Sequence, residues 1–242
     1  MKLNKSGFAV TGIIYSMLVL FLALVLLIMS NLASRKVLFD KEKGEILEKI
    51  NGSFLCVAIA PTEQLLWNNT SNVMESKVVG VQATSEEPYQ SGAVYSCNLG
   101  DGPRTFYVLE DEGENVKLLM NENLEGKVTW CDQNGPNPYD TACAADGAKA
   151  HMIRQTSNWT KLMIAGGTVE LPDAQDLVEL NTPDWARINM DVSIFGYWTS
   201  TVAFSNRAQF MNYSTYLNSR SIDESHGGVR PVIKLLKSYF SL

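Results

Sequence analysis

Residues 227–235 read GGVRPVIKL, and this stretch decides how the end of the chain folds. We expect it to form a strand of a compact sheet. Arg230 stands directly before Pro231, which restricts the arginine to extended backbone geometry. Its guanidinium carries five N–H donors. We therefore predict that Arg230 donates hydrogen bonds to loop carbonyls or to a carboxylate such as Asp176.

Two runs that precede this stretch predict further strands of the same sheet: YWTST at 197–201 and AQFMNYS at 208–214. Tyr197 and Trp198 are bulky anchors for a fold that is rich in loops. The hydroxyl side chains that follow them can satisfy backbone groups in irregular loops. We therefore interpret the first run as support for the fold.

Closer to the N-terminus, short apolar runs alternate with Gly and Asx turns, which is typical of a β meander. These runs are 93–97, 105–110 and 116–121. A helix is predicted at 146–159. A second helix is predicted after Leu171-Pro172, with Asp173 as its candidate N-cap.

Four motifs therefore follow one another: LPDAQDL at 171–177, YWTST at 197–201, AQFMNYS at 208–214 and GVRPVIKL at 228–235. This order resembles the bacterial C-type-lectin-like superfamily, which also contains the formylglycine-generating enzymes. The stretch VKLLMNENLEGKVTW at 116–130 also looks like the first part of this domain in membrane-anchored surface proteins of Gram-positive gut bacteria. The resemblance implies an α+β fold over 92–237, with short antiparallel strands, two helices and long loops.

Most residues of these motifs are expected to support the fold. They are Leu171, Pro172, Tyr197, Trp198, Arg230 and Pro231. The loop near 213–225 is expected to contact a ligand instead of supporting the fold, because it is rich in Tyr and Ser, which supply adaptable contact surface. We interpret it as a candidate ligand loop. Its predicted contacts are Tyr213, Tyr216, Asn218, Arg220 and Asp223.

The N-terminal part contains a long apolar segment, with no charged residue between Lys5 and Arg35. As a helix, the 22 residues from Phe8 to Met29 span roughly 33 Å, enough to cross a hydrocarbon core of about 30 Å. The apolar region of a cleaved signal peptide is shorter, about 7–15 residues. The sequence therefore predicts an uncleaved transmembrane helix over 8–33.

The expected organisation follows from this segment. Residues 1–7 are a short basic tail, and 34–51 continue as a helical stalk that Asn51-Gly52 ends. Residues 52–91 are a poorly defined connecting region, in which FLCVAIA at 54–60 is interpreted as a strand and a short helix is expected after Pro61. The lectin-like domain is expected over 92–237.

The charges are distributed unevenly between the two parts. Residues 1–50 carry seven basic and four acidic side chains, a net charge of +3, whereas 51–242 carry 13 basic and 22 acidic ones, a net charge of −9. An acidic main domain repels phosphate backbones, so we expect no nucleic-acid partner. The basic end flanks the apolar segment, as in membrane anchors, which makes membrane lipid the first expected partner.

The cysteines bear on the orientation in the membrane. A count of flanking positive charges slightly favours a cytoplasmic C-terminal part. However, all four cysteines follow the apolar segment, and Cys131 and Cys143 bracket a turn-rich loop that a disulfide would suit. Buried free thiols are the alternative. We predict a Cys131–Cys143 disulfide and a single-pass protein of the cell membrane, with its C-terminal domain extracellular.

The N-terminal layout also supports a structural alternative. A short basic leader, the pair GF and an apolar helix resemble type IV pilins and pseudopilins, which assemble through that helix. Those families usually carry Glu at the fifth position after the processed Gly, where this chain has Gly12. The alternative function is a pilin-like structural subunit.

Catalytic chemistry is not indicated by the sequence. Formylglycine-generating enzymes use a cysteine pair late in the domain, and no cysteine follows Cys143 here. His151 and His226 lack metal-ligand or triad spacing. The oxygen-bearing residues of the loop at 132–140 are interpreted as a solvated turn. We expect no enzyme activity, no catalytic residue, no cofactor and no metal.

These observations lead to one expected function. The chain is predicted to be a membrane-anchored protein of the cell surface that binds or displays a ligand through a non-enzymatic head. Its partner is an extracellular ligand or protein, which the sequence does not identify.

Overall fold

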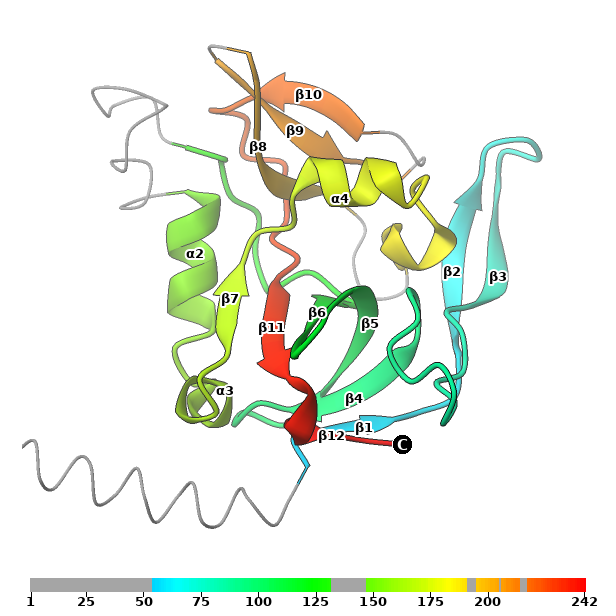
Figure 1. The fold of residues 1–242 in the computed structure, drawn as a ribbon. Helices are drawn as coiled ribbons and strands as arrows, with labels where there is room; N and C mark the ends of the chain where they lie inside the picture. The colour runs from blue at the N-terminus through cyan, green and yellow to red at the C-terminus, as the bar shows by residue number, and fades with distance from the viewer. Residues whose placement is uncertain (1–53, 132–146, 191–194, 205, 214–216) are drawn as a thin grey trace, which may run out of the picture. The chain divides into compact units, whose positions relative to one another are not determined.

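The computed structural model describes residues 54–131, 147–190, 195–204, 206–213 and 217–242 (Figure 1). The chain divides into two units, Met1–Lys49 and Ile50–Leu242. The predicted tail, transmembrane helix and stalk, residues 1–51, lie outside the described residues. In the part that the structure describes, no helix has both the length and the apolar character needed to cross a membrane.

The centre of the Ile50–Leu242 unit is a seven-stranded sheet with the order β12-β1-β4-β5-β6-β11-β7. Its strands are β1 (Cys56–Ala58), β4 (Val94–Asn98), β5 (Pro103–Glu112), β6 (Asn115–Met120), β7 (Thr168–Glu170), β11 (Val232–Leu236) and β12 (Phe240–Ser241). Neighbouring strands are antiparallel except β1 and β12, which are parallel.

Two smaller sheets flank this centre (Figure 1). One has the order β10-β9-β8. Its strands are β8 (Tyr197–Phe204), β9 (Arg207–Met211) and β10 (Leu217–Ser221). The other is a hairpin of β2 (Thr62–Asn68) and β3 (Val73–Val79), which Figure 1 draws at the right-hand edge of the domain.

The helices of the described residues are short. They are α2 (Ala148–Gln155), α3 (Thr160–Ile164), α4 (Ala174–Glu179) and the 3-10 turns η2 (Asp184–Ala186) and η3 (Lys237–Tyr239). Asp173 caps α4 as predicted, because its carboxylate accepts the backbone N–H of Gln175 at 2.8 Å.

The central sheet is buried on both faces. Tyr95, Phe106 and Val108 belong to one core cluster, with helices α2 and α3, whereas the alternate residues Tyr107 and Leu109 belong to a second cluster. The second cluster also contains apolar residues of α4 and η2. A strand that is covered on both sides needs apolar residues at successive positions. This requirement explains continuous runs such as TFYVL at 105–109.

The predicted α+β class was wrong. Strands and bridges account for about 43% of the described residues and helices for about 15%, so the domain is mostly β. The helix predicted over 146–159 ends at Gln155 in the structure. Of the predicted short antiparallel strands, two helices and long loops, the strands dominate the described residues, and the helices are few and short.

The stretch expected to connect stalk and domain also differs from the prediction. β1 lies in the central sheet between β4 and β12, and Pro61 is followed by the strand β2 instead of a helix. Gln64 and Leu66 are buried, whereas their neighbours Glu63 and Leu65 are exposed and partly exposed. This alternation has the period of a half-buried strand.

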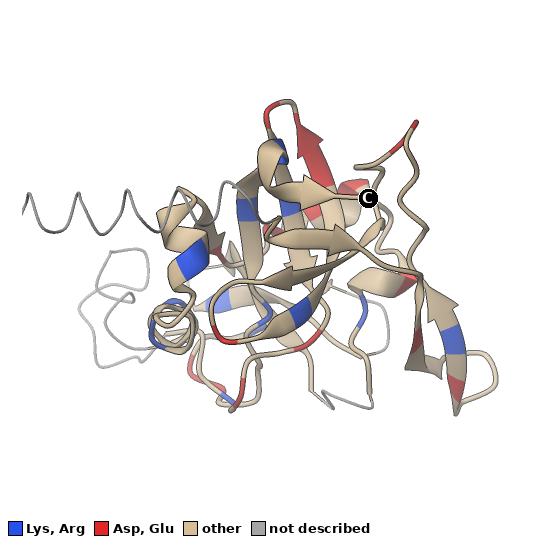
Figure 2. Cartoon of the chain, turned by 90° about the horizontal axis from the view of Figure 1, so that it is seen from below, with Lys and Arg blue, Asp and Glu red and all other residues tan. Residues whose placement is uncertain are grey.

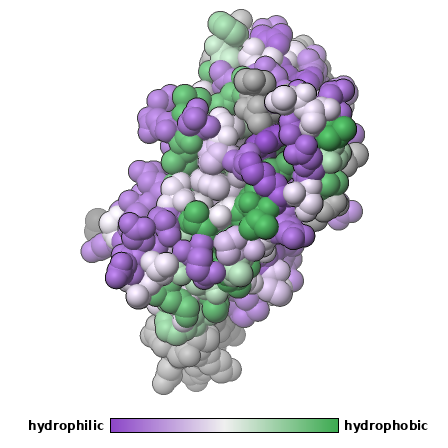
Figure 3. Space-filling model, turned by 90° about the vertical axis from the view of Figure 1, so that its right-hand side faces the viewer, coloured by the Kyte–Doolittle hydropathy of each residue, from purple (hydrophilic) through white to green (hydrophobic). Residues whose placement is uncertain are grey.

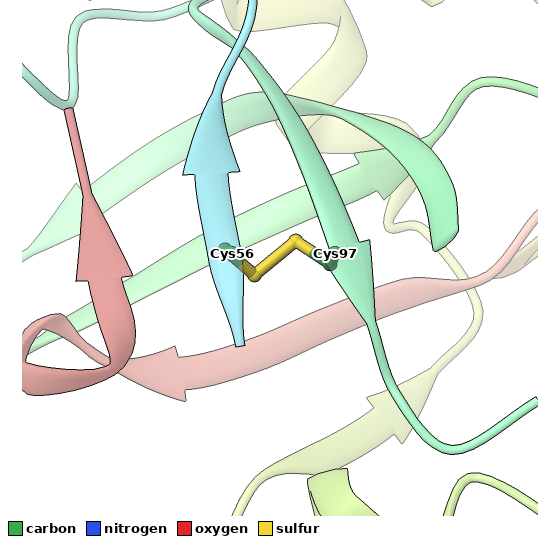
Figure 4. The surroundings of a disulfide bond; sticks show 2 residues. All are labelled: Cys56 and Cys97. Atoms are coloured by element: carbon green, nitrogen blue, oxygen red, sulfur yellow. A yellow bond between two sulfur atoms is a disulfide. The ribbon is translucent and has the colours of Figure 1, made fainter. Parts of the chain in front are cut away.

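A disulfide joins the central strands β1 and β4 (Figure 4). Cys56 and Cys97 are direct partners in the antiparallel register, with a Cα–Cα distance of 4.0 Å, and both are fully buried. The sequence analysis did not predict this pair. Cys131 is buried and disulfide-bonded too, and its predicted partner Cys143 lies outside the described residues.

Candidate ligand-binding cleft

The motifs LPDAQDL at 171–177 and YWTST at 197–201 meet where α4 begins beside β8. The backbone N–H of Ser200 donates to the carbonyl of Pro172 at 2.9 Å. The N–H of Ala174 donates to the hydroxyl oxygen of Thr201 at 3.0 Å, and that hydroxyl lies 3.0 Å from a carboxylate oxygen of Asp173. These contacts fix the start of α4 against the strand.

A cleft of about 480 Å³ lies at this joint, a size in the range of small-molecule sites. Its apolar lining consists of Met152, Val169 and Leu171. Its polar lining consists of Lys117, Lys149, Glu170, Asp173 and Ser200. The lining therefore comes from α2, β6, β7, β8 and the turn before α4, elements that are far apart in the sequence.

Lys117 is held by carboxylates at one side of the cleft. Its side chain is only 13% exposed, and its ammonium lies 2.6 Å from Asp176 and 3.9 Å from Glu170. Burial alone would lower the pKa of Lys117. The net effect raises this pKa, because Asp176 accepts a hydrogen bond from the ammonium and adds negative charge, as do Glu170 and Glu112. Lys117 therefore stays charged at neutral pH.

Lys149 is the other cation of the cleft. It is exposed on α2, and it has no ion pair or side-chain hydrogen bond within the described ranges. The side chain of Glu170 is 49% exposed, and its one ion pair in the described part of the chain is the long contact to Lys117. A ligand in the cleft would therefore meet an ammonium and a carboxylate that the described residues hold weakly or not at all, together with apolar side chains.

Arg230 stabilises the middle of the domain. It is fully buried, and its guanidinium donates to the carbonyls of Trp185, Ala186 and Arg187 at 2.7–2.9 Å and also to the carbonyl of Met120. Of the two kinds of partner predicted, the structure has the carbonyls. The other candidate, the Asp176 carboxylate, is bonded to Lys117 instead.

Both aromatic residues of the YWTST motif are fully buried, Tyr197 in the second core cluster and Trp198 in the first. The ring of Tyr197 is 5.3 Å from the Arg230 guanidinium carbon, and its hydroxyl donates to Ala186 at 2.7 Å. Burial raises the pKa of Tyr197 to about 12 and lowers the pKa of Arg230. The indole of Trp198 donates to Val128 at 2.9 Å.

The other motif residues take part in the backbone structure around the cleft. Leu171 lines it, and the carbonyl of Pro172 accepts from β8. The carbonyl of Pro231 accepts the backbone N–H of Met120 at 2.9 Å, which continues the pairing of β11 with β6. One residue of the six expected to support the fold, Leu171, is thus also placed to contact a ligand.

The described residues of the predicted ligand loop have separate partners. Tyr213 is 45% exposed and packs edge-to-face against Trp67, with ring centroids 6.2 Å apart. Tyr216 lies outside the described residues, and Asn218 is on β10. Two further residues make local contacts: Arg220 with Glu224 at 3.2 Å, and Asp223 with the hydroxyl of Ser221.

The sequence analysis missed three residues that the structure makes prominent: Lys117, Lys149 and Trp67. Only Lys117 had a visible signal, since it interrupts the apolar run VKLLM and lysines within buried strands are seldom unpaired. Among the described residues, no group of three or more His, Cys, Asp or Glu could hold a metal ion. The oxygen-rich turn at 132–140 lies outside them.

No family model matches the chain, and no curated protein or solved structure matches it either. The resemblance to the C-type-lectin-like superfamily therefore stays a prediction. Along the described chain, basic and acidic residues alternate on the same elements (Figure 2).

Proposed function

We propose that the chain is a membrane-anchored, single-pass, non-enzymatic binding protein of the cell surface, whose extracellular head takes a small ligand in the cleft between α2, β7 and β8. The observation that carries this proposal is the lining of the cleft. It combines the ammonium of Lys149, which has no ion pair with any described residue, and a half-exposed carboxylate on Glu170 with the apolar side chains of Met152 and Leu171.

The chemistry of the lining selects the ligand class. A carboxylate on the ligand would pair with Lys149, and an ammonium on the ligand would pair with Glu170 or Asp173. An apolar side chain would cover Met152 and Leu171. A free amino acid or a short peptide carries all three features, so a zwitterion with an apolar side chain is the proposed ligand.

Two observations support the location outside the cell. Disulfides persist in oxidising compartments and are rare in the cytosol. The head has a fully buried Cys56–Cys97 bond and a disulfide-bonded Cys131. The apolar sequence of Phe8–Met29 supports the anchor.

A titration of the full-length chain in detergent tests the binding. We expect L-leucine to bind, and leucinamide and N-acetyl-leucine, which each lack one charge, to bind at least tenfold more weakly. Lys149→Met should weaken leucine binding at least tenfold, which corresponds to about 1.4 kcal/mol. Isothermal calorimetry measures the dissociation constants.

The matched control is Lys161→Met, which removes a lysine on the neighbouring helix α3 that does not line the cleft. It should bind leucine like the natural chain. If leucine does not bind, or if Lys149→Met and Lys161→Met bind it equally, the cleft is not the site that we propose.

The location is tested separately by the state of the thiols. Cells that make the full-length chain are lysed directly into denaturant with a maleimide that adds mass. We expect the membrane fraction to contain the protein and its cysteines to react only after reduction. Reaction without reduction would place the head in a reducing compartment and contradict the extracellular assignment.

A further inference from the structure

The outer edge of β3 is an unpaired strand edge. β3 pairs only with β2, and no other backbone hydrogen bond to Val73–Val79 exists among the described residues. Figure 1 shows β3 on the outer side of the hairpin. By contrast, the far edge of β2 is partly covered, because Leu65 accepts the N–H of Met190 at 2.9 Å.

An exposed strand edge of this length can pair with another strand unless something prevents it. β3 has seven residues, and Val73 and Val78 are 49% and 61% exposed. No proline or bulge interrupts its register with β2. The backbone groups along this edge are thus free to continue the sheet.

The sequence of β3, VMESKVV, is complementary to itself about Ser76. If a second β3 runs antiparallel with Ser76 opposite Ser76, Glu75 faces Lys77 of the second copy, and Lys77 faces its Glu75. In the same register, Met74 faces Val78 and Val73 faces Val79. Opposite charges and apolar residues directly opposite each other stabilise antiparallel pairs.

We propose that two copies of this chain associate through β3, antiparallel and about a twofold axis at Ser76, to form a continuous sheet β2-β3-β3-β2. The inference does not depend on the cleft or on its ligand. A twofold interface requires a self-complementary surface, and the register about Ser76 supplies one.

The charges on β3 are already oriented by their own neighbours. Glu75 accepts hydrogen bonds from Asn68 and Ser71, each at 2.8 Å, and these bonds lower its pKa. Lys77 forms an ion pair with Asp184. Both side chains are therefore partly ordered before a second copy arrives, which reduces the entropic cost of pairing.

The opposite face of the hairpin supplies apolar surface. Trp67 and Leu65 of β2 pair with Met74 and Ser76 of β3, and Val78 lies on the same face. In the four-stranded sheet the apolar residues of the two copies would become continuous. Figure 3, which views this side of the molecule, shows hydrophobic side chains at several places among hydrophilic ones.

Swapping the charges of Glu75 and Lys77 tests the proposed strand register about Ser76. The full-length chain is reconstituted in nanodiscs large enough for two copies, and association is measured by fluorescence energy transfer between labelled copies. Glu75→Lys and Lys77→Glu should each weaken association at least tenfold, because each opposes like charges. The double variant E75K/K77E restores both opposite pairs and should return association to within threefold of the natural chain.

A second measurement does not depend on charge. Ser76→Cys brings two thiols together at the axis, where paired Cα atoms lie about 4.5–5.5 Å apart, within the range of disulfides. We expect a covalent dimer on a non-reducing gel. The control Ser71→Cys lies in the hairpin loop, away from the axis. It should give at least tenfold less covalent dimer.

Several results would overturn the proposal. They are a monomeric natural chain, association that both single charge variants leave unchanged, a double variant as weak as the single ones, or equal crosslinking at positions 71 and 76. Association through the predicted membrane helix alone would leave association of both single charge variants unchanged. Strand pairing in another register would leave the double variant as weakly associated as the single ones.

Discussion

Replacing Arg230 by methionine should lower the free energy of unfolding by at least about 4 kcal/mol, and the variant is expected to be largely unfolded if the domain has the usual stability of about 5–15 kcal/mol. The guanidinium is fully buried and donates to four backbone carbonyls, those of Met120, Trp185, Ala186 and Arg187. A buried acceptor that loses its donor costs about 1–3 kcal/mol.

Lysine should not rescue this position. Its ammonium is a point charge with three donors, whereas the guanidinium is a planar fork that reaches carbonyls on two sides. We therefore expect Arg230→Lys to be destabilised by at least about 3 kcal/mol, because at least two carbonyls lose their donor and the remaining buried charge is poorly bonded.

Urea denaturation of the full-length chain in detergent, followed by tryptophan fluorescence, measures both variants. The control is Arg154→Met on the exposed side of α2, which should change stability by less than about 0.5 kcal/mol. A loss below about 1 kcal/mol for Arg230→Met would mean that the carbonyls find other donors and that the arginine does not hold the core together.

Local features of the fold could be predicted from the sequence. The runs at 93–97, 105–110 and 116–121 overlap β4, β5 and β6, since the turns between them carry glycine or Asx residues. The cap at Asp173 and the hydrogen bonds of Arg230 to carbonyls also depend on residue chemistry and neighbouring positions. In each case the deciding signal lies within a few residues.

The class of the fold depends on pairing between strands that are far apart in the sequence, and the predicted class was wrong for this reason. β1 has only three residues, and its partners β4 and β12 lie about 40 and 180 residues further along the chain. Nothing within residues 52–91 shows those partners. The stretch after Pro61 has good helix formers, yet burial of Gln64 and Leu66 favours a strand.

The cleft illustrates the same limit. Leu171 and Ser200 belong to motifs that the sequence singled out, although for structural roles. Lys117 and Lys149 reach the cleft from β6 and α2, so only the tertiary arrangement brings the two ammonium groups into the same cleft as Leu171. Tyr213 of the predicted ligand loop does not line this cleft, and its partner Trp67 is almost 150 residues earlier.

The second large effect is expected from the buried disulfide. Cys56→Ala combined with Cys97→Ala should lower the free energy of unfolding by about 4 kcal/mol, the loop-closure value for a separation of 41 residues. The unfolded chain gains freedom between these residues. The native strand β1, with only three residues, retains its backbone bonds to β4 and β12.

The two single variants distinguish this cause from lost packing. If the closed loop is responsible, Cys56→Ala and Cys97→Ala should each lose nearly as much stability as the double variant, since either change removes the bond. If packing of the two sulfur atoms were responsible, each single change would cost about half, and reductant, which also breaks the disulfide of Cys131, would destabilise the natural chain and the double variant equally. Denaturation with and without reductant separates the two outcomes.

The loop-closure result would also mean that the head needs an oxidising compartment to reach its full stability, which is the condition that the proposed location supplies.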